Sequence, residues 1–232
     1  VSNYAAAVSA FRTGSLDVVW FGGLTGVQAR LQTPGAKVLA QRDIDAKFTS
    51  VFIANGASGL RPITSSDQLV QLKGRRLAFG SESSTSGRLM PQYFLAENGV
   101  SITDLAGGGP GFSGSHDATI AVVQSGAYDV GALNEQGWRS NVEEGRVDPT
   151  KVAVIWRTPT YADYHWLARP DLDRRFGSGF TERVQNALLS LSAETEAGSE
   201  ILELFGAERF IPASDEDYKK IESVGRDLGK IR

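Results

Sequence analysis

Short, continuous apolar runs alternate along the chain with longer segments in which apolar residues recur every three or four positions. The runs LDVVWF (16–21) and RRLAFG (75–80) have the length and composition of buried strands. The segment 114–128 places Ile120, Val123 and Ala127 on one face, which indicates a helix packed on a core. This alternation predicts an α/β fold with mostly parallel sheets flanked by helices.

The same pattern gives the expected elements along the whole chain. Strands are expected at 16–21, 36–41, 48–55, 75–80, 129–134, 151–158 and 164–169. Helices are expected at 3–13, 22–31, 89–99, 114–128, 135–145, 181–191, 199–205 and 214–231.

Three connections share one plan, in which a strand is followed by a glycine-rich turn with Ser or Thr and then by a helix. They are WFGGLTG (20–26), SSTSGR (83–88) and GFSGSHDAT (111–119). Ligands of open α/β sheets bind beyond the carboxyl ends of strands, where helix N-termini present free N–H groups to anions. The alternative is that these residues are only N-caps, worth about 1 kcal/mol each. The presence of three such turns favours an anion-binding site that needs no fixed positive charge.

Spacing argues against two other kinds of site. A phosphate-binding P-loop requires G-x-x-x-x-G-K-[ST], but six residues separate Gly80 from Gly87, and Arg88 and Leu89 follow. Neither GFSGS nor GASGL matches the serine-hydrolase motif G-x-S-x-G. Nucleotide binding and serine hydrolysis are therefore disfavoured.

Composition narrows the class of protein further. The 232 residues are 41% hydrophobic and 22% charged, with a net charge of −3, which is ordinary for a globular protein and offers no field for nucleic acid. Without cysteine, the chain cannot form disulfides, thiolate-ligated metal sites or a thiol nucleophile. His116 and His165 are the only histidines, so a triad or a histidine-rich metal site has few candidates.

The pair His116–Asp117 stands at an expected helix start. Asp117 could simply complement the helix dipole, with His116 on the surface. Beside the hydroxyl turns, an imidazole can instead donate to an anion, whereas a carboxylate accepts only from a protonated anion or an ammonium group. An inward Asp117 would therefore favour partly protonated or aminated oxyanions.

A third group of polar residues lies in TPTYADYHWLAR (158–169). Asp163 stands between Tyr161 and Tyr164, and these two tyrosines could close over a ligand and donate from their phenols, whereas Trp166 is expected in the core. Trp20 and Trp138 are also assigned to packing.

Taken together, SSTSGRLMPQYF, GFSGSHDATIAVVQSGAYDVGALN and VDPTKVAVIWRTPTYADYHWLARPDL resemble the phosphonate/phosphite-type solute-binding proteins of ABC importers. VVWFGGLTGVQARL resembles their first-lobe turn, and the selenate-binding branch is the most similar. The resemblance implies a two-lobed type II periplasmic binding protein with ligand in the cleft. Members begin with a strand and helix before the segment that starts here, so the first strand–helix unit of lobe one is expected to be missing.

The resemblance also implies the ligand-binding residues, with no cofactor and no metal. They are Ser84, Thr85, Ser86, His116, Asp117, Thr25, Tyr161, Asp163, Tyr164 and Tyr4. Lobe one is expected to comprise 1–56 and 160–232, and lobe two 57–159. The hinge is expected near 55–58 and 157–161.

The resulting expectation is a non-enzymatic, monomeric, periplasmic or extracytoplasmic receptor. It binds a small tetrahedral oxyanion, such as phosphonate, phosphite or phosphate, and delivers it to an ABC permease through which it is associated with the membrane. Three alternatives stay open: a selenate receptor, a sensor that docks a kinase, and an enzyme like the thiamin-precursor synthases.

Overall fold

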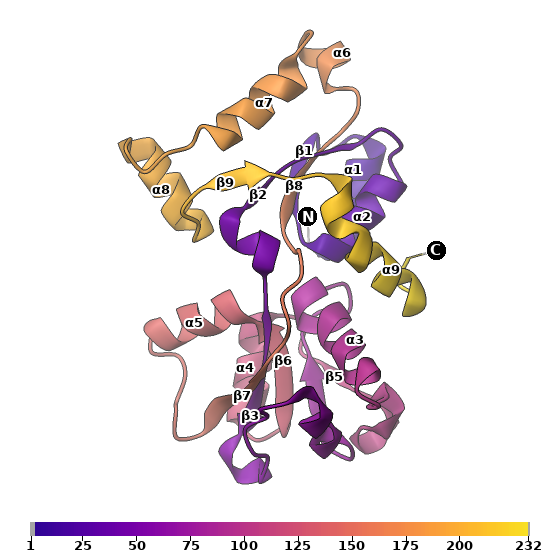
Figure 1. The fold of residues 1–232 in the computed structure, drawn as a ribbon, viewed down its shortest axis with the longest axis vertical. Coiled ribbons are helices and arrows are strands. Elements are labelled where there is room, and N and C mark those ends of the chain that lie inside the picture. The colour runs from indigo at the N-terminus through magenta and orange to yellow at the C-terminus, as the bar shows by residue number, and fades with distance from the viewer. Residues whose placement is uncertain (1–2, 232) are drawn as a thin grey trace. The chain divides into compact units, whose positions relative to one another are not determined.

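The computed structural model describes residues 3–231, which form two compact units with separate sheets and cores (Figure 1). The first unit comprises the chain up to Phe48 and from Tyr161 onward, and the second unit comprises Thr49–Thr160. The sequence placed the first boundary after residue 56. The structure places it at the start of the strand Ser50–Asn55, because this strand pairs with two strands of the second unit.

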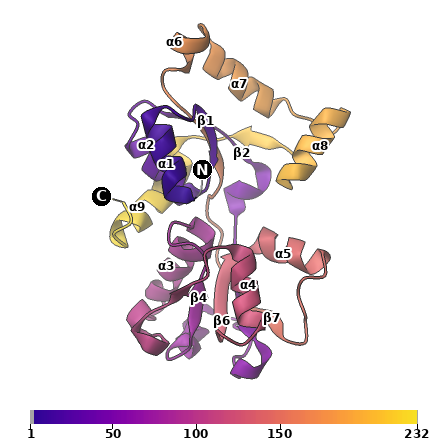
Figure 2. The same ribbon diagram turned by 180° about the vertical axis from the view of Figure 1, so that it is seen from behind.

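The first unit is built on a four-stranded sheet in the order β1-β8-β2-β9. Its strands are β1 (Val18–Phe21), β2 (Lys37–Arg42), β8 (His165–Ala168) and β9 (Phe210–Pro212). Its helices are α1 (Tyr4–Thr13), α2 (Gly23–Leu31), α6 (Leu172–Phe176), α7 (Phe180–Leu189), α8 (Glu196–Phe205) and α9 (Lys219–Asp227). One core cluster joins α1 and α2 to the sheet through Phe11, Ala29 and Phe21, and another joins α8 to β9 through Leu202 and Phe210. Figure 2 shows these elements from behind.

The second unit is built on a five-stranded sheet in the order β5-β4-β6-β3-β7. Its strands are β3 (Ser50–Asn55), β4 (Leu77–Phe79), β5 (Gly111–Phe112), β6 (Val130–Asn134) and β7 (Val152–Arg157). Its helices are α3 (Met90–Glu97), α4 (His116–Gln124) and α5 (Glu135–Glu143). Ile120 of α4 and Trp138 of α5 share one core cluster, whereas Leu95 of α3 belongs to the other, so helices cover both faces of the sheet.

The expectation of mostly parallel sheets is wrong. Among the strand pairs of the described residues, β4 pairs in parallel with β5 and β6, and the other five pairs are antiparallel. The strand–helix–strand segment β1-α2-β2 does keep its two strands in one direction. However, β8 comes from a distant part of the chain and runs between them in the opposite direction. A local sequence pattern carries no information about such an inserted strand.

The segments that pass between the units are anchored in the first unit by a pair of backbone hydrogen bonds. Phe48 N–H donates to Tyr161 O at 2.9 Å, and Tyr161 N–H donates to Phe48 O at 3.0 Å. Within residues 3–231, no helix has the length and apolar character needed to cross a membrane.

Close packing in the first unit requires a glycine in α2. A Cβ on Gly26 would lie 2.2 Å from Nε2 of His165, whose side chain is buried against Tyr218 with ring centroids 4.0 Å apart. The backbone of α2 can therefore approach β8 only if position 26 carries no side chain.

Gly26→Ala is expected to lower the free energy of unfolding by about 2–3 kcal/mol, because the methyl group displaces a ring enclosed on all sides. Urea unfolding followed by near-UV circular dichroism measures the loss. Gly109→Ala is the control, since Gly109 has extended backbone and open space around its Cα, and it should change stability by less than about 0.5 kcal/mol. Equal stability of the two variants would contradict this account.

Candidate functional site

The hydroxyl turn, defined here as Ser84–Gly87, leads from β4 into α3 in the second unit. Ser84, Thr85 and Ser86 are at most 4% exposed. Ser84 Oγ accepts a hydrogen bond from Gly87 N–H at 2.9 Å, which leaves its own proton to donate elsewhere. Ser86 Oγ is buried without a hydrogen-bond partner among the described residues. The turn is thus richer in hydroxyl groups than a helix cap requires, as the sequence suggested.

The turn continues as a π-helix, Thr85–Leu89, and Pro91 explains this geometry. Proline has no N–H, so the carbonyl groups four and five residues before it, those of Gly87 and Ser86, lose their helical donor. Gly80 N–H donates to Gly87 O at 2.9 Å, and Ser50 Oγ donates to Ser86 O at 2.7 Å. One group just after β4 and one at the start of β3 therefore hold the turn in place.

The other two carbonyl groups of the turn are satisfied within the helix. Leu89 N–H donates to Ser84 O, and Met90 N–H donates to Thr85 O. Every carbonyl oxygen of residues 84–87 thus has a donor inside the fold. The backbone acceptors of this turn are therefore engaged, while its hydroxyl groups can still donate to a ligand.

His116 lies beside the hydroxyl turn. A Cβ on Gly87 would lie 3.0 Å from Cε1 of His116, so the imidazole can lie this close only because residue 87 is glycine. The backbone N–H of Asn134 points at Nδ1 of His116 at 3.4 Å, whereas Nε2 is buried without a partner among the described residues. A ring that accepts at Nδ1 carries its proton at Nε2. His116 therefore adds a second buried donor beside Ser86.

Burial lowers the pKa of His116 to about 4, against the charge of Asp117, which acts to raise it. The imidazole is consequently neutral at physiological pH and donates through its Nε2–H without carrying a charge.

Asp117 is brought to the same helix start but not into the same environment. It is exposed, and its Oδ1 accepts from Asn141 Nδ2 at 2.8 Å. The carboxylate thus has a partner on α5. This arrangement fits the structural alternative for Asp117 better than the inward acceptor.

Two of the three hydroxyl-containing turns lie side by side because β5 pairs in parallel with β4. Phe79 is opposite Phe112, so both turns leave the sheet at the same edge. Ser113 N–H donates to Phe79 O at 2.9 Å, and Gly114 N–H donates to Gly80 O at 3.2 Å. The turn containing Thr25 belongs to the first unit.

In the first unit, the N-terminus of α2 is already occupied by a carboxylate. Gly23 N–H donates to Asp163 Oδ1 at 2.8 Å, and Asp163 is fully buried. Thr25, also buried, donates its hydroxyl proton to Gly22 O at 3.1 Å. This turn therefore presents an acceptor where the hydroxyl turn of the second unit presents donors.

The three tyrosines of the predicted set lie in different surroundings. Burial, and after it the negative charge of Asp163, raises the pKa of Tyr4, which places Tyr4 within the electrostatic reach of this carboxylate. The rings of Tyr161 and Tyr164 both pack edge-on against Phe48, and Tyr164 also stacks on Trp20 at 5.7 Å. Their rings contribute to aromatic packing, and their role as ligand residues stays a prediction.

Sequence reasoning missed three residues that organise the hydroxyl turn and His116. Ser50 holds the turn from β3, Asn134 orients the imidazole through its backbone N–H, and Gly87 makes room for the ring. The signal for Asn134 was available, because it ends a strand and precedes a helix just as the hydroxyl turn does. Ser50 gave no signal, since its contact depends on pairing between distant strands.

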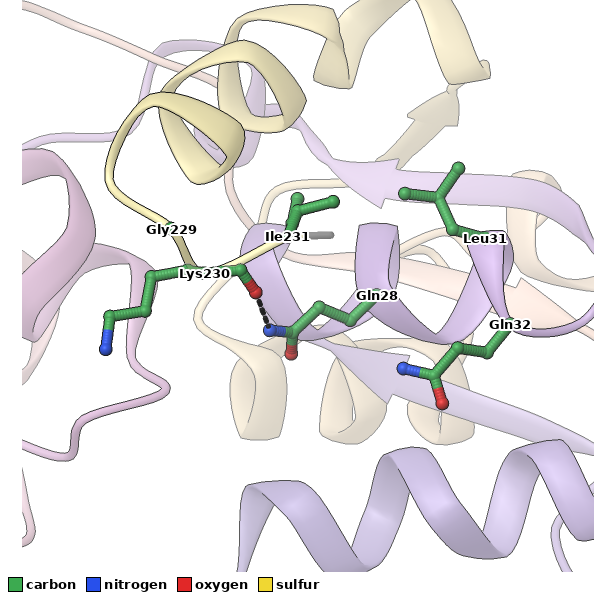
Figure 3. A pocket seen from close by; sticks show the side chains of 6 residues that line it. All are labelled: Gln28, Leu31, Gln32, Gly229, Lys230 and Ile231. Atoms are coloured by element: carbon green, nitrogen blue, oxygen red, sulfur yellow. Dashed lines mark hydrogen bonds between the residues drawn. The ribbon is translucent and has the colours of Figure 1, made fainter.

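A separate pocket of the first unit contains none of the predicted residues. It has a volume of about 430 Å³ and lies between α2 and the segment after α9 (Figure 3). Gln28 Nε2 donates to Lys230 O at 2.8 Å across it, as the dashed line in Figure 3 marks. Its lining offers no cluster of charged or unpartnered buried groups comparable with Ser86 and His116. Nor does any part of residues 3–231 group three or more acidic or histidine side chains as metal ligands.

Comparison with known proteins assigns nearly the entire chain to one protein family. Residues 1–218 match the family described as "ABC transporter, phosphonate, periplasmic substrate-binding protein". The chain belongs to this family. The resemblance noted from the hydroxyl turn and the Ser-His-Asp segment is thereby confirmed.

Individual relatives agree with the family assignment. The chain is 53% identical, over its whole length and 78% of the relative's, to a probable ABC transporter phosphite-binding protein, PhnD1, of Prochlorococcus marinus. Over 161 residues, 68% of its length, it is 26% identical to the phosphonates-binding periplasmic protein of Escherichia coli, and it covers 46% of that protein. These names refer to phosphite and phosphonates, so the expected similarity to the selenate-binding branch is not supported by them.

Solved structures agree with the expected fold. The structure of P. marinus PhnD1 in complex with methylphosphonate matches with a TM-score of 0.96, covering the whole chain and 85% of that structure. A phosphonate-transporter binding protein of Pseudomonas aeruginosa, 21% identical, matches with a TM-score of 0.77 over 99% of the chain and 74% of that structure. The fold is thus that of the type II periplasmic binding proteins, and the matched relatives are solute-binding proteins rather than enzymes.

The tautomer of His116 leads to a prediction for nuclear magnetic resonance. Nitrogen–proton spectra of the ligand-free protein should show a neutral imidazole protonated at Nε2 near neutral pH, titrating only near pH 4. Because the unfolded chain binds this proton with the ordinary pKa of about 6.5, the stability contributed by neutral His116 is complete above that pH. It is lost as the pH falls toward 4. His165→Gln assigns the signals, and an ordinary pKa or an Nδ1–H tautomer for His116 would contradict the geometry.

Proposed function

We propose that this protein is the solute-binding component of an ABC importer and that its ligand is a small tetrahedral phosphorus oxyanion, phosphite or a simple phosphonate. The observation that carries the proposal is the pair of buried, unpartnered donors, Ser86 Oγ and His116 Nε2, beside a turn whose carbonyl groups are all occupied. Their presence in a chain 53% identical to a phosphite-binding protein favours this ligand class over sulfate-like anions.

The proposed binding chemistry replaces the water shell of the oxyanion with fixed dipoles. Ser84, Thr85 and Ser86 supply hydroxyl and amide donors, and His116 donates from Nε2. Hydrogen bonds to a charged acceptor are worth about 1.5–3 kcal/mol each. These groups hold oxygen atoms without a nucleophile and base positioned for reaction, because His116 accepts at Nδ1 and donates at Nε2. We therefore propose binding without catalysis.

We further propose that Tyr4, Thr25, Asp163, Tyr161 and Tyr164 of the first unit contribute to ligand binding. Asp163 is the informative member, because an ionised carboxylate can only accept a hydrogen bond. A phosphite or phosphonate that keeps one proton supplies that hydrogen, whereas sulfate and selenate at neutral pH do not. Asp163 thus takes over the selective role that the sequence had assigned to Asp117.

Transport requires a partner and a movement, both of which are part of the proposal. The ligand-loaded protein is expected to act in the periplasm as a monomer and to associate with the membrane through an ABC permease. The two units are expected to rotate about the crossovers at Phe48–Thr49 and Thr160–Tyr161, as in other binding proteins that move about a hinge.

Isothermal titration tests the function directly. Phosphite or methylphosphonate should bind with a dissociation constant below about 1 mM and more tightly than sulfate or selenate. Ser86→Ala should weaken binding about 10- to 100-fold, because it removes one donor to a charged acceptor. Ser83→Ala, in the same connection, is the control and should bind normally. If neither phosphorus anion binds, the proposed function fails.

The role of Asp163 can be separated from that of Asp117 by two isosteric variants. Asp163→Asn keeps an oxygen for Gly23 N–H but removes the charge, so it should weaken phosphite binding about tenfold and narrow the preference for phosphite over sulfate. Asp117→Asn should change neither quantity appreciably, because Asp117 is exposed and paired with Asn141. Titration calorimetry with both anions gives the ratio. The reverse result would return the selective role to Asp117.

A further inference from the structure

Arg88 is a buried cation at the end of the hydroxyl turn. Arg88 is 7% exposed. Its Nη1 donates to Glu82 O at 3.2 Å, and its guanidinium carbon lies 5.4 Å from the centre of the Phe112 ring. Its Nε is buried without a hydrogen-bond partner among the described residues. Burial lowers the pKa of Arg88, which the charge of Glu82 partly opposes, and an arginine stays protonated nevertheless.

A second buried arginine shows how the fold ordinarily treats such a charge. Arg42, 5% exposed, forms a two-pronged ion pair with Asp45, with Nε and Nη2 at 2.6 and 2.8 Å from the carboxylate oxygens. Within residues 3–231, Arg88 forms no ion pair of this kind. Removing a charge from water is costly unless an ion pair offsets it, and Glu82 acts on Arg88 through its field without forming one, so the burial of this charge needs another explanation.

The position of Arg88 supplies that explanation. Arg88 follows Ser86 by two residues and belongs to the same π-helix, Thr85–Leu89. We propose that the bound oxyanion is the counter-charge of Arg88, which raises the affinity of the hydroxyl turn through its field and without touching the ligand. This inference rests on the proposed function. It adds a fixed positive charge to an anion-binding site that the sequence predicted to bind through amide and hydroxyl dipoles alone.

The charge of the ligand makes the effect measurable. A tenfold change in affinity corresponds to about 1.4 kcal/mol, which is the size of the interaction between two unit charges that are not in contact, at an effective dielectric constant of about 20. A dianion doubles the interaction energy with Arg88, so removing the Arg88 charge should weaken dianion binding about 100-fold. A residue that only shapes the turn would change the affinity for both charge states of the ligand by the same factor.

The experiment compares the wild-type protein with Arg88→Met, Arg88→Lys and the control Arg61→Met, whose exposed charge lies in the same unit. Calorimetric titration with methylphosphonate is run below and above its second ionisation. Arg88→Met should lose about tenfold for the monoanion and about 100-fold for the dianion. Arg88→Lys should keep the wild-type ratio between the two, and Arg61→Met should match the wild type.

Stability of the ligand-free protein provides an independent readout. Because Arg88→Met removes an unpaired buried charge, its melting temperature without ligand should be unchanged or higher, although its affinity is lower. Arg88→Gln provides a second neutral variant in case the Met side chain packs poorly. Failure of both neutral variants to fold would overturn the proposal, because it would make Arg88 a structural residue.

The remaining outcomes separate this inference from the proposed function. If the wild-type protein binds neither phosphite nor methylphosphonate, the proposed function and the inference fall together. If the wild-type protein binds and Arg88→Met weakens both charge states equally, or neither, only the role of Arg88 is overturned.

Discussion

The parallel alignment of β4 with β5 and β6 is the constraint on which the candidate site depends. The three strands end at one edge of the sheet, so the segments that follow them converge there. These segments supply Ser86, His116 and Asn134 respectively. Backbone pairing in the sheet thereby brings together residues that are far apart in sequence, and the absence of a side chain at Gly87 allows the close approach of His116. Strand direction therefore determines which segments meet at the candidate site, and the side chains of those segments determine its chemistry.

The two units use the same local plan for opposite purposes. In the second unit, the helix start after β4 is left with donors, and buried hydroxyl and imidazole groups join them. In the first unit, the corresponding helix start is neutralised by Asp163 from another part of the chain. A strand–turn–helix motif with Ser or Thr is therefore not a site by itself. The observed difference between the two helix starts is that a carboxylate of the chain itself accepts a hydrogen bond at one of them.

Much of this organisation could be predicted from sequence, and the exceptions share one cause. Helices and strands follow from local periodicity, and the hydroxyl turn and His116 follow from strand–turn–helix spacing. The antiparallel insertion of β8, the contact from Ser50 and the occupation of α2 by Asp163 all depend on pairing between distant segments. The same limit explains the misplaced first boundary, because β3 has the same local pattern whichever sheet it joins. Family resemblance supplied the ligand class, which local patterns had only narrowed to small anions.

The occupied carbonyl groups of residues 84–87 have a consequence for the orientation of zwitterionic solutes. Under the proposed function, the phosphonate end of a molecule that also carries an ammonium is the end expected at this turn, because the backbone carbonyl groups there already accept hydrogen bonds within the fold. The polarity of the peptide backbone would then favour one orientation of such a solute.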